Sequence, residues 1–133
     1  MLLLTDNDVV GAVRAFQRIL ASPEWVGLTA TLEIEFVELK DIDLPSDAPD
    51  VAVWQRSQEV GALLMTGNRS SGEGSLDQTI TAHGSPESLP VLTIGDPRRV
   101  IRDPAYAREC VLSLLDFVDR IETLRGTGRL FIP

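Results

Sequence analysis

The chain has 133 residues, a single cysteine and a formal net charge of −8 at pH 7. This length fits one domain spanning residues 1–133, and the charge excludes a protein that coats nucleic acid by bulk electrostatics, although not one that contacts a short nucleic acid through a local patch. No apolar run approaches the roughly 20 residues of a membrane span, and the first residues lack the basic leader of a signal peptide. Cys110 has no partner for an internal disulfide. We therefore expect a cytoplasmic protein that does not contact a membrane.

The first eight residues, MLLLTDND, are the stretch on which the rest of the prediction depends. Three leucines and a threonine without polar alternation are typical of a central parallel strand that is covered on both faces. Asp6, Asn7 and Asp8 follow directly, at the edge where α/β sheets usually build their sites. An apolar stripe then predicts an amphipathic helix from Asp8 to Leu20.

The remaining elements continue the alternation of strands and helices. Residues 25–27 are predicted as a connection and residues 29–39 as a strand near a sheet edge, because Leu32, Ile34 and Phe36 alternate with glutamates. In chain order there follow a loop at 40–49, a helix from about 47–50 to Gly61, a buried strand at 62–66, a flexible stretch at 70–74, a short helix at 75–83 with Ser75 as its N-cap, a buried strand at 90–94, a long helix from Asp103 to Gly126 and a terminal strand at 129–133. This order predicts a three-layer α/β/α fold with a mostly parallel central sheet of about five strands.

Acidic side chains recur where these strands end and where the next helices begin. Parallel strands bring those positions to one edge of the sheet. The polar residues expected at this edge are Asp6, Asp8, Asp50, Asn68, Asp77 and Asp96. Carboxylates with an amide oxygen suit a hard divalent cation such as Mg²⁺ or Mn²⁺, which would hold a phosphodiester and activate a bound water.

Each of these residues also has a simpler structural explanation. Asp8 would cap the first helix, Asp50 would share a capping arrangement with Asp47, Asp77 would favour its helix as a first-turn acid, Asp96 would form a turn with Pro97, and Asn68 would serve the turn after Gly67. For Asp6 the purely structural explanation is the weakest, because a carboxylate at the end of a buried strand needs a partner.

The basic residues and the two reactive side chains give fewer indications. Arg69, Arg98 and Arg99, with Arg102 beside them, form either a basic lip for phosphate or a solvated run of charge. His83 is the only histidine and stands at a predicted helix end, which argues against histidine-based nucleophilic catalysis. Cys110 falls on the apolar face of the long helix and is expected in the core.

The order of these motifs resembles the small bacterial PIN-like proteins over nearly the whole chain. The resemblance rests on the strand followed by Asp6-Asn7-Asp8 and a helix, on Asp50 at the start of a helix, and on the stretches LLMTGNRSSGEGSLDQTI and GTGRLFIP. It implies a PIN-type fold and a Mg²⁺- or Mn²⁺-dependent ribonuclease site in which Asp6, Asp50 and Asn68 are catalytic and metal-binding. Asp77 and Asp8 would be supporting metal ligands. The sequence departs from the active pattern at Asn68, where such nucleases usually carry aspartate.

Two functions are therefore left open by the sequence. The first is a metal-dependent endoribonuclease, of the toxin kind, with RNA as substrate and an antitoxin or other protein as partner. The second is a catalytically degenerate module that binds a protein or RNA without cleaving it, which the acidic balance and Asn68 favour. A receiver-type signalling domain is excluded as an active one, because Asn68 stands at the phosphoacceptor position and Lys40, the only lysine, comes too early. A homodimer through the terminal strand or through residues 70–74 is left open.

Overall fold

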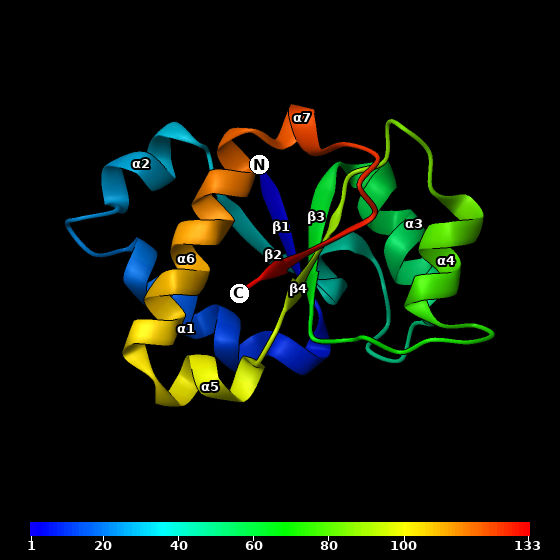
Figure 1. Ribbon diagram of the computed structural model, residues 1–133, viewed down its shortest axis with the longest axis horizontal. Coiled ribbons are helices and arrows are strands. Elements are labelled where there is room, and N and C mark those ends of the chain that lie inside the picture. Colours follow the sequence, from blue (N-terminus) through cyan, green and yellow to red (C-terminus); the bar gives the residue numbers. More distant parts are fainter.

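Five parallel strands form one sheet in the computed structural model, which describes residues 1–133 (Figure 1). The strands are β1 (Leu2–Thr5), β2 (Glu35–Glu38), β3 (Ala62–Thr66), β4 (Val91–Ile94) and β5 (Arg129–Ile132). Their order across the sheet is β2-β1-β3-β4-β5, and all four neighbouring pairs are parallel. The prediction of an α/β fold with a central parallel sheet is confirmed.

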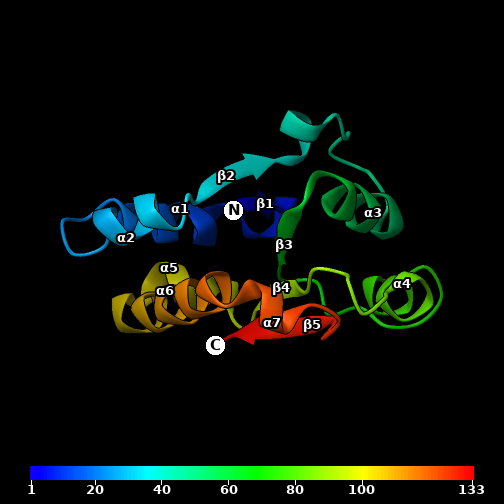
Figure 2. The same cartoon turned by 90° about the horizontal axis from the view of Figure 1, so that it is seen from above.

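Helices cover both faces of this sheet, as Figure 2 shows. The helices are α1 (Val10–Leu20), α2 (Val26–Thr31), α3 (Asp50–Val60), α4 (Leu76–His83), α5 (Pro97–Arg102), α6 (Pro104–Asp119) and α7 (Ile121–Leu124), with short 3-10 turns at Asn7–Val9 and Leu39–Ile42. Helices α1, α2, α5 and α6 lie on one side, and α3 and α4 lie on the other. None of these helices is long and apolar enough to cross a membrane.

The two faces of the sheet explain why its inner strands are uniformly apolar. Leu3 points into the larger core cluster, where it joins Phe16 of α1 and Leu114 of α6. Leu64 points the other way, into a smaller cluster that contains Trp54 of α3. Because alternate residues are buried on opposite faces, β1, β3 and β4 have no wet side and need no polar alternation.

The last crossover runs on an unusual side of the sheet. The connection from β1 to β2 passes over the face of α1, whereas the connections from β2 to β3 and from β3 to β4 move in the opposite direction over the other face. These three crossovers therefore have the same hand. The connection from β4 to β5 continues in the same direction but returns through α5 and α6 to the face of α1. It has the opposite, left-handed form, which is rare in parallel sheets.

Two predicted elements near the start of the chain were wrong. Residues 25–27 do not form a simple connection, because α2 begins at Val26, and the predicted strand at 29–39 shrinks to β2. Its first residues continue the helix, and Glu33, with φ of 53°, reverses the backbone before β2 begins. Leu32 and Ile34 still pack on the larger cluster. The alternation of apolar and glutamate residues therefore indicated which side chains are buried, but not that the segment is a strand. The edge position predicted for this strand is confirmed.

The helices after β4 also differ from the prediction. Asp96 and Pro97 do not form a simple turn, because the Asp96 carboxylate accepts the Arg99 N–H and caps α5, with Pro97 in its first turn. The long helix predicted to reach Gly126 ends at Asp119, and α7 follows as a separate turn. Its start was predicted correctly. The Asp103 carboxylate accepts the N–H groups of Ala105 and Tyr106, and the Tyr106 hydrogen bond is the main reason that the pKa of Asp103 falls below its usual value.

Candidate functional site

The carboxyl ends of β1 and β3 lie side by side at the point where the sheet changes its direction of growth. The chain leaves β1 towards α1 on one face and leaves β3 towards α4 on the other. Open α/β sheets bind their ligands in the crevice that such a divergence leaves. Asp6 and Asp8 follow β1 here, and Gly67 and Asn68 follow β3.

Asp6 and Asp8, which we call the acidic pair, converge on a single hydroxyl group. The Thr66 hydroxyl donates to Asp6 Oδ2 at 2.8 Å and lies 3.5 Å from Asp8 Oδ1. A hydroxyl has only one hydrogen, so Asp8 Oδ1 is left without a full donor. The outer oxygens are better satisfied, because Asp6 Oδ1 accepts the Asn7 N–H at 2.8 Å and Asp8 Oδ2 accepts the Gly67 N–H at 3.1 Å. Asp6 Oδ2 and Asp8 Oδ1 thus both lie within hydrogen-bond distance of one hydroxyl, and Asp8 itself is open to solvent.

The electrostatics of Asp8 agree with this geometry. Burial raises the pKa of Asp8, the negative charge of Asp6 raises it further, and the Gly67 N–H offsets only part of both effects. Gly67 favours this approach, because a Cβ there would lie 3.1 Å from Asp8 Oδ2 and 3.1 Å from the Pro97 ring, and both neighbours would have to move by a few tenths of an ångström. The alternative role of Asp8 as a helix cap is wrong, since Asp6 caps the first turn and α1 has no side-chain cap.

Asp50 and Asn68 form a second contact beside the acidic pair. The Asn68 side chain donates from Nδ2 to Asp50 Oδ2 at 3.0 Å, while its Oδ1 accepts the Ser70 N–H at 2.8 Å. The opposite amide orientation would set Nδ2 against that N–H, so Ser70 fixes the orientation. Asn68 therefore gives Asp50 a hydrogen-bond donor. The capping arrangement of Asp50 with Asp47 is absent, because Pro49 precedes α3 and no side chain caps it.

Arg129, which the sequence analysis did not single out, joins three segments behind Asn68. Its guanidinium donates to Asp77 Oδ1 at 2.6 Å, to the Thr93 hydroxyl at 2.6 Å and to the Asn68 carbonyl oxygen at 2.7 Å. The Arg129 side chain is only 12% exposed. Asp77 therefore lies in an ion pair rather than in the acidic pair. The sequence feature that could have indicated this role is an arginine as the first residue of an otherwise apolar strand, RLFI.

The acidic pair offers two carboxylates to a cation, and no larger cage of metal-binding side chains is present. No three His, Cys, Asp or Glu side chains lie close enough together to hold a metal ion. Mg²⁺ is commonly bound by only one or two carboxylates, with waters and substrate phosphates completing its shell. Asp6 and Asp8 supply two carboxylates whose facing oxygens share one donor, whereas Asp50 and Asp77 are held by Asn68 and Arg129.

The predicted phosphate-binding arginines differ in how strongly they are held. Arg69 and Arg98 are exposed, make no side-chain hydrogen bond or ion pair, and follow β3 and β4 at the carboxyl edge. Arg99 donates to Asp103 Oδ2 at 3.2 Å, and its guanidinium carbon lies 4.5 Å from the centre of the Tyr106 ring. Of these three arginines, Arg69 and Arg98 are therefore the two that a ligand can reach without breaking an existing contact.

Neither reactive side chain contributes to this edge. His83 is exposed in the last turn of α4, as predicted. Cys110 is fully buried in the larger core cluster, and burial raises its pKa to about 11. Its thiolate is therefore scarce at neutral pH, and it cannot act as a ready nucleophile.

Comparisons with known proteins add no family to this description. No family model, no curated protein and no solved structure matches the chain. The function must therefore be argued from the residues at the carboxyl edge.

The acidic pair predicts that Asp8→Asn raises the melting temperature of the metal-free protein at neutral pH. The asparagine Oδ1 keeps the Gly67 hydrogen bond, and its NH₂ group takes the place of Asp8 Oδ1, so that a donor replaces the negative charge that opposes Asp6. The pKa of Asp8 in the folded state lies above its usual value, so its charge costs stability as pH rises through that pKa. The cost disappears at low pH, where Asp8 is protonated in both the folded and the unfolded state. Thermal unfolding of the wild type and of Asp8→Asn in the presence of a chelator, at a series of pH values, measures the difference in melting temperature. Asp119→Asn, at an exposed residue of α6, controls for net charge. A lower melting temperature for Asp8→Asn than for this control contradicts the description of the pair.

Proposed function

We propose that the protein is a Mg²⁺- or Mn²⁺-dependent endoribonuclease of the PIN-like type, with Asp6 and Asp8 as its metal ligands. The observation that carries the proposal is the convergence of two carboxylate oxygens on one hydroxyl hydrogen at the switch point of the sheet. A cation bound there would satisfy both oxygens. RNA as the substrate rests on the sequence resemblance alone.

The residues of the chain have separate roles in this proposal. Asp6 and Asp8 hold the ion, and the Thr66 hydroxyl orients the Asp6 carboxylate. Arg69 and Arg98 bind phosphate oxygens, because they are exposed guanidinium groups that follow β3 and β4 at the carboxyl edge. Asp50, through Asn68, fixes the backbone that carries Arg69. The bound ion would supply Lewis acidity towards a phosphodiester and an activated water.

Asp6→Asn is expected to abolish Mn²⁺-dependent RNA cleavage and saturable Mn²⁺ binding. Loss of a ligand should weaken binding by more than the roughly 10- to 100-fold that loss of an outer partner costs. Titration calorimetry measures the binding, and gel assays with labelled RNAs of varied sequence measure cleavage. The matched control is Asp119→Asn, which removes the same charge from an exposed site on α6. Unchanged cleavage by Asp6→Asn excludes this mechanism.

A second candidate function is a module that binds a protein or RNA partner without cleaving it. The favouring observation is the Asn68 amide, which donates to Asp50 where a third carboxylate would otherwise strengthen the metal site. Such a module would leave every RNA intact in excess Mn²⁺. The two candidates therefore separate in the wild-type protein, before any variant is made.

A further inference from the structure

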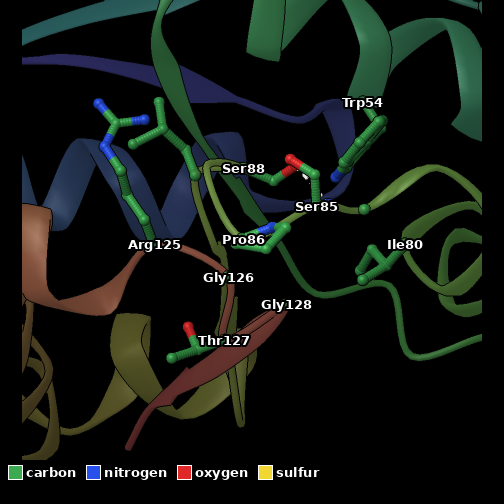
Figure 3. Close-up of a pocket in the computed structure, with 11 residues that line it drawn as sticks. Trp54, Ile80, Ser85, Pro86, Ser88, Arg125, Gly126, Thr127 and Gly128 are labelled. Atoms are coloured by element: carbon green, nitrogen blue, oxygen red, sulfur yellow. Dashed lines mark hydrogen bonds between the residues drawn. The ribbon is translucent and has the colours of Figure 1, made fainter.

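The largest cavity lies at the opposite, amino edge of the sheet and is not used by the proposed function. It has a volume of about 560 Å³ and is shown in Figure 3. The segment before β4, residues 84–89, and the segment before β5, residues 125–128, form one wall. Trp54 of α3 and Ile80 of α4 form an apolar wall. We call this space the amino-edge cavity, and its volume lies in the range of about 300–1,000 Å³ that small-molecule sites occupy.

Trp54 brings an unused hydrogen-bond donor to this cavity. The residue is only 5% exposed, and its indole N–H makes no hydrogen bond in the structure. Figure 3 shows the indole nitrogen on the side of the ring that faces Ser85. The other tryptophan makes a useful contrast, because Trp25 Nε1 is sealed from solvent and also lacks a partner. The Trp54 N–H is the indole donor that a ligand in the cavity can reach.

Two further donors line the same space. The hydroxyls of Ser85 and Ser88 lie 3.3 Å apart and share one hydrogen, so the second hydroxyl hydrogen is available. The Gly128 carbonyl accepts the Val91 N–H, but the Gly128 N–H itself makes no hydrogen bond. The polar side of the cavity therefore presents hydrogen-bond donors, and a ligand that binds there needs hydrogen-bond acceptors.

The charges around the cavity disfavour an anion as the source of those acceptors. The carboxyl end of α4, with its negative dipole, runs into the lining at Gly84 and Ser85. Arg125 provides no free positive charge, because its guanidinium donates twice to Glu122, at 2.6 and 3.1 Å, and once to the Glu87 carbonyl oxygen at 2.8 Å. A neutral carbonyl fits both the donors and the field.

We propose that the amino-edge cavity is a binding site for a small neutral molecule that joins a carbonyl acceptor to an apolar ring. The carbonyl accepts from the Trp54 indole, and the ring packs on the apolar wall of Trp54 and Ile80. This site is separate from the acidic pair and does not depend on the proposed nuclease function.

The test uses three ring compounds of nearly equal size as probes: benzamide, benzoate and benzylamine. They present a neutral acceptor, an anionic acceptor and a cationic donor, respectively. The two indole N–H signals of the ¹⁵N-labelled protein report binding, with Trp25 as an internal control because it lies outside the cavity. Benzamide is expected to shift the Trp54 indole signal saturably and to leave the Trp25 signal in place. Benzylamine has no acceptor for the Trp54 N–H, and benzoate is disfavoured by the negative end of α4, so each should bind about tenfold more weakly than benzamide.

Two variants separate the indole donor from the apolar wall. Trp54→Phe keeps an aromatic ring but removes the N–H, and should weaken benzamide binding about tenfold, as read from the Gly128 amide signal. Trp25→Phe, the matched control, should leave the benzamide affinity unchanged. If benzamide fails to shift the Trp54 signal in the wild-type protein, or if benzylamine or benzoate binds as well as benzamide, the proposal is overturned. The wild-type titration decides the matter even if Trp54→Phe does not fold.

Discussion

Arg129→Met is expected to lower the free energy of unfolding by roughly 2–4 kcal/mol. The methionine keeps much of the aliphatic volume but donates no hydrogen bond. The fully buried Thr93 hydroxyl and the Asn68 carbonyl oxygen would each lose their guanidinium donor, and Asp77 would lose its ion-pair partner. An unsatisfied buried polar group costs about 1–3 kcal/mol, so these losses exceed those at an ordinary surface ion pair.

Denaturant unfolding of the wild type, Arg129→Met and Arg120→Met measures this difference. Arg120 is the matched control, because it pairs with Asp116 across one turn of α6 with both side chains about half exposed. Pairs of that kind contribute about 0–1 kcal/mol. Equal midpoints for the two variants would show that the Arg129 network contributes no more than a surface pair.

The architecture was predictable because it depends on patterns that extend over whole elements. The apolar strands at 2–5, 62–66 and 91–94 were found within one residue of their bounds, since burial on both faces leaves a run without polar interruption. The caps Ser75 and Asp103 were found for a similar reason, because capping chemistry is local. The opposite hand of the β4–β5 crossover was not predictable, because it depends on which face α6 covers, and the sequence pattern does not fix that choice.

The edge of the sheet that carries the polar residues could be predicted from the sequence, but the contacts between those residues could not. The sequence brings six polar residues to the carboxyl edge, yet it cannot say which carboxylates meet. The structure joins Asp6 with Asp8 through Thr66, a residue that reads as strand in the sequence. It assigns Asp77 to Arg129, which lies 52 positions away. Which distant charges pair depends on the order of the strands in the sheet. The local pattern of apolar and polar residues predicts the strands but not their order.

Asn68→Asp is expected to destabilise the metal-free protein and to make its stability depend strongly on Mn²⁺. The Asn68 Nδ2 donor to Asp50 would be replaced by a second carboxylate, so one hydrogen bond is lost and two negative charges face each other. The new carboxylate would still accept the Ser70 N–H, which keeps the turn in place. The expected loss is roughly 1–3 kcal/mol in a chelator.

Excess Mn²⁺ should return most of that loss, because a ligand that binds only the folded state stabilises it in proportion to the logarithm of its concentration over its dissociation constant. Melting temperatures with chelator and with Mn²⁺ measure the difference. Asn68→Ala is the control, since it removes the same hydrogen bond without adding charge and should gain no more from Mn²⁺ than the wild type. A Mn²⁺ response that is the same in all three proteins would place Asp50 outside the reach of any ion bound at this edge. A larger response in Asn68→Asp would show that the asparagine is what keeps Asp50 out of the metal site and restricts the wild-type ligands to Asp6 and Asp8.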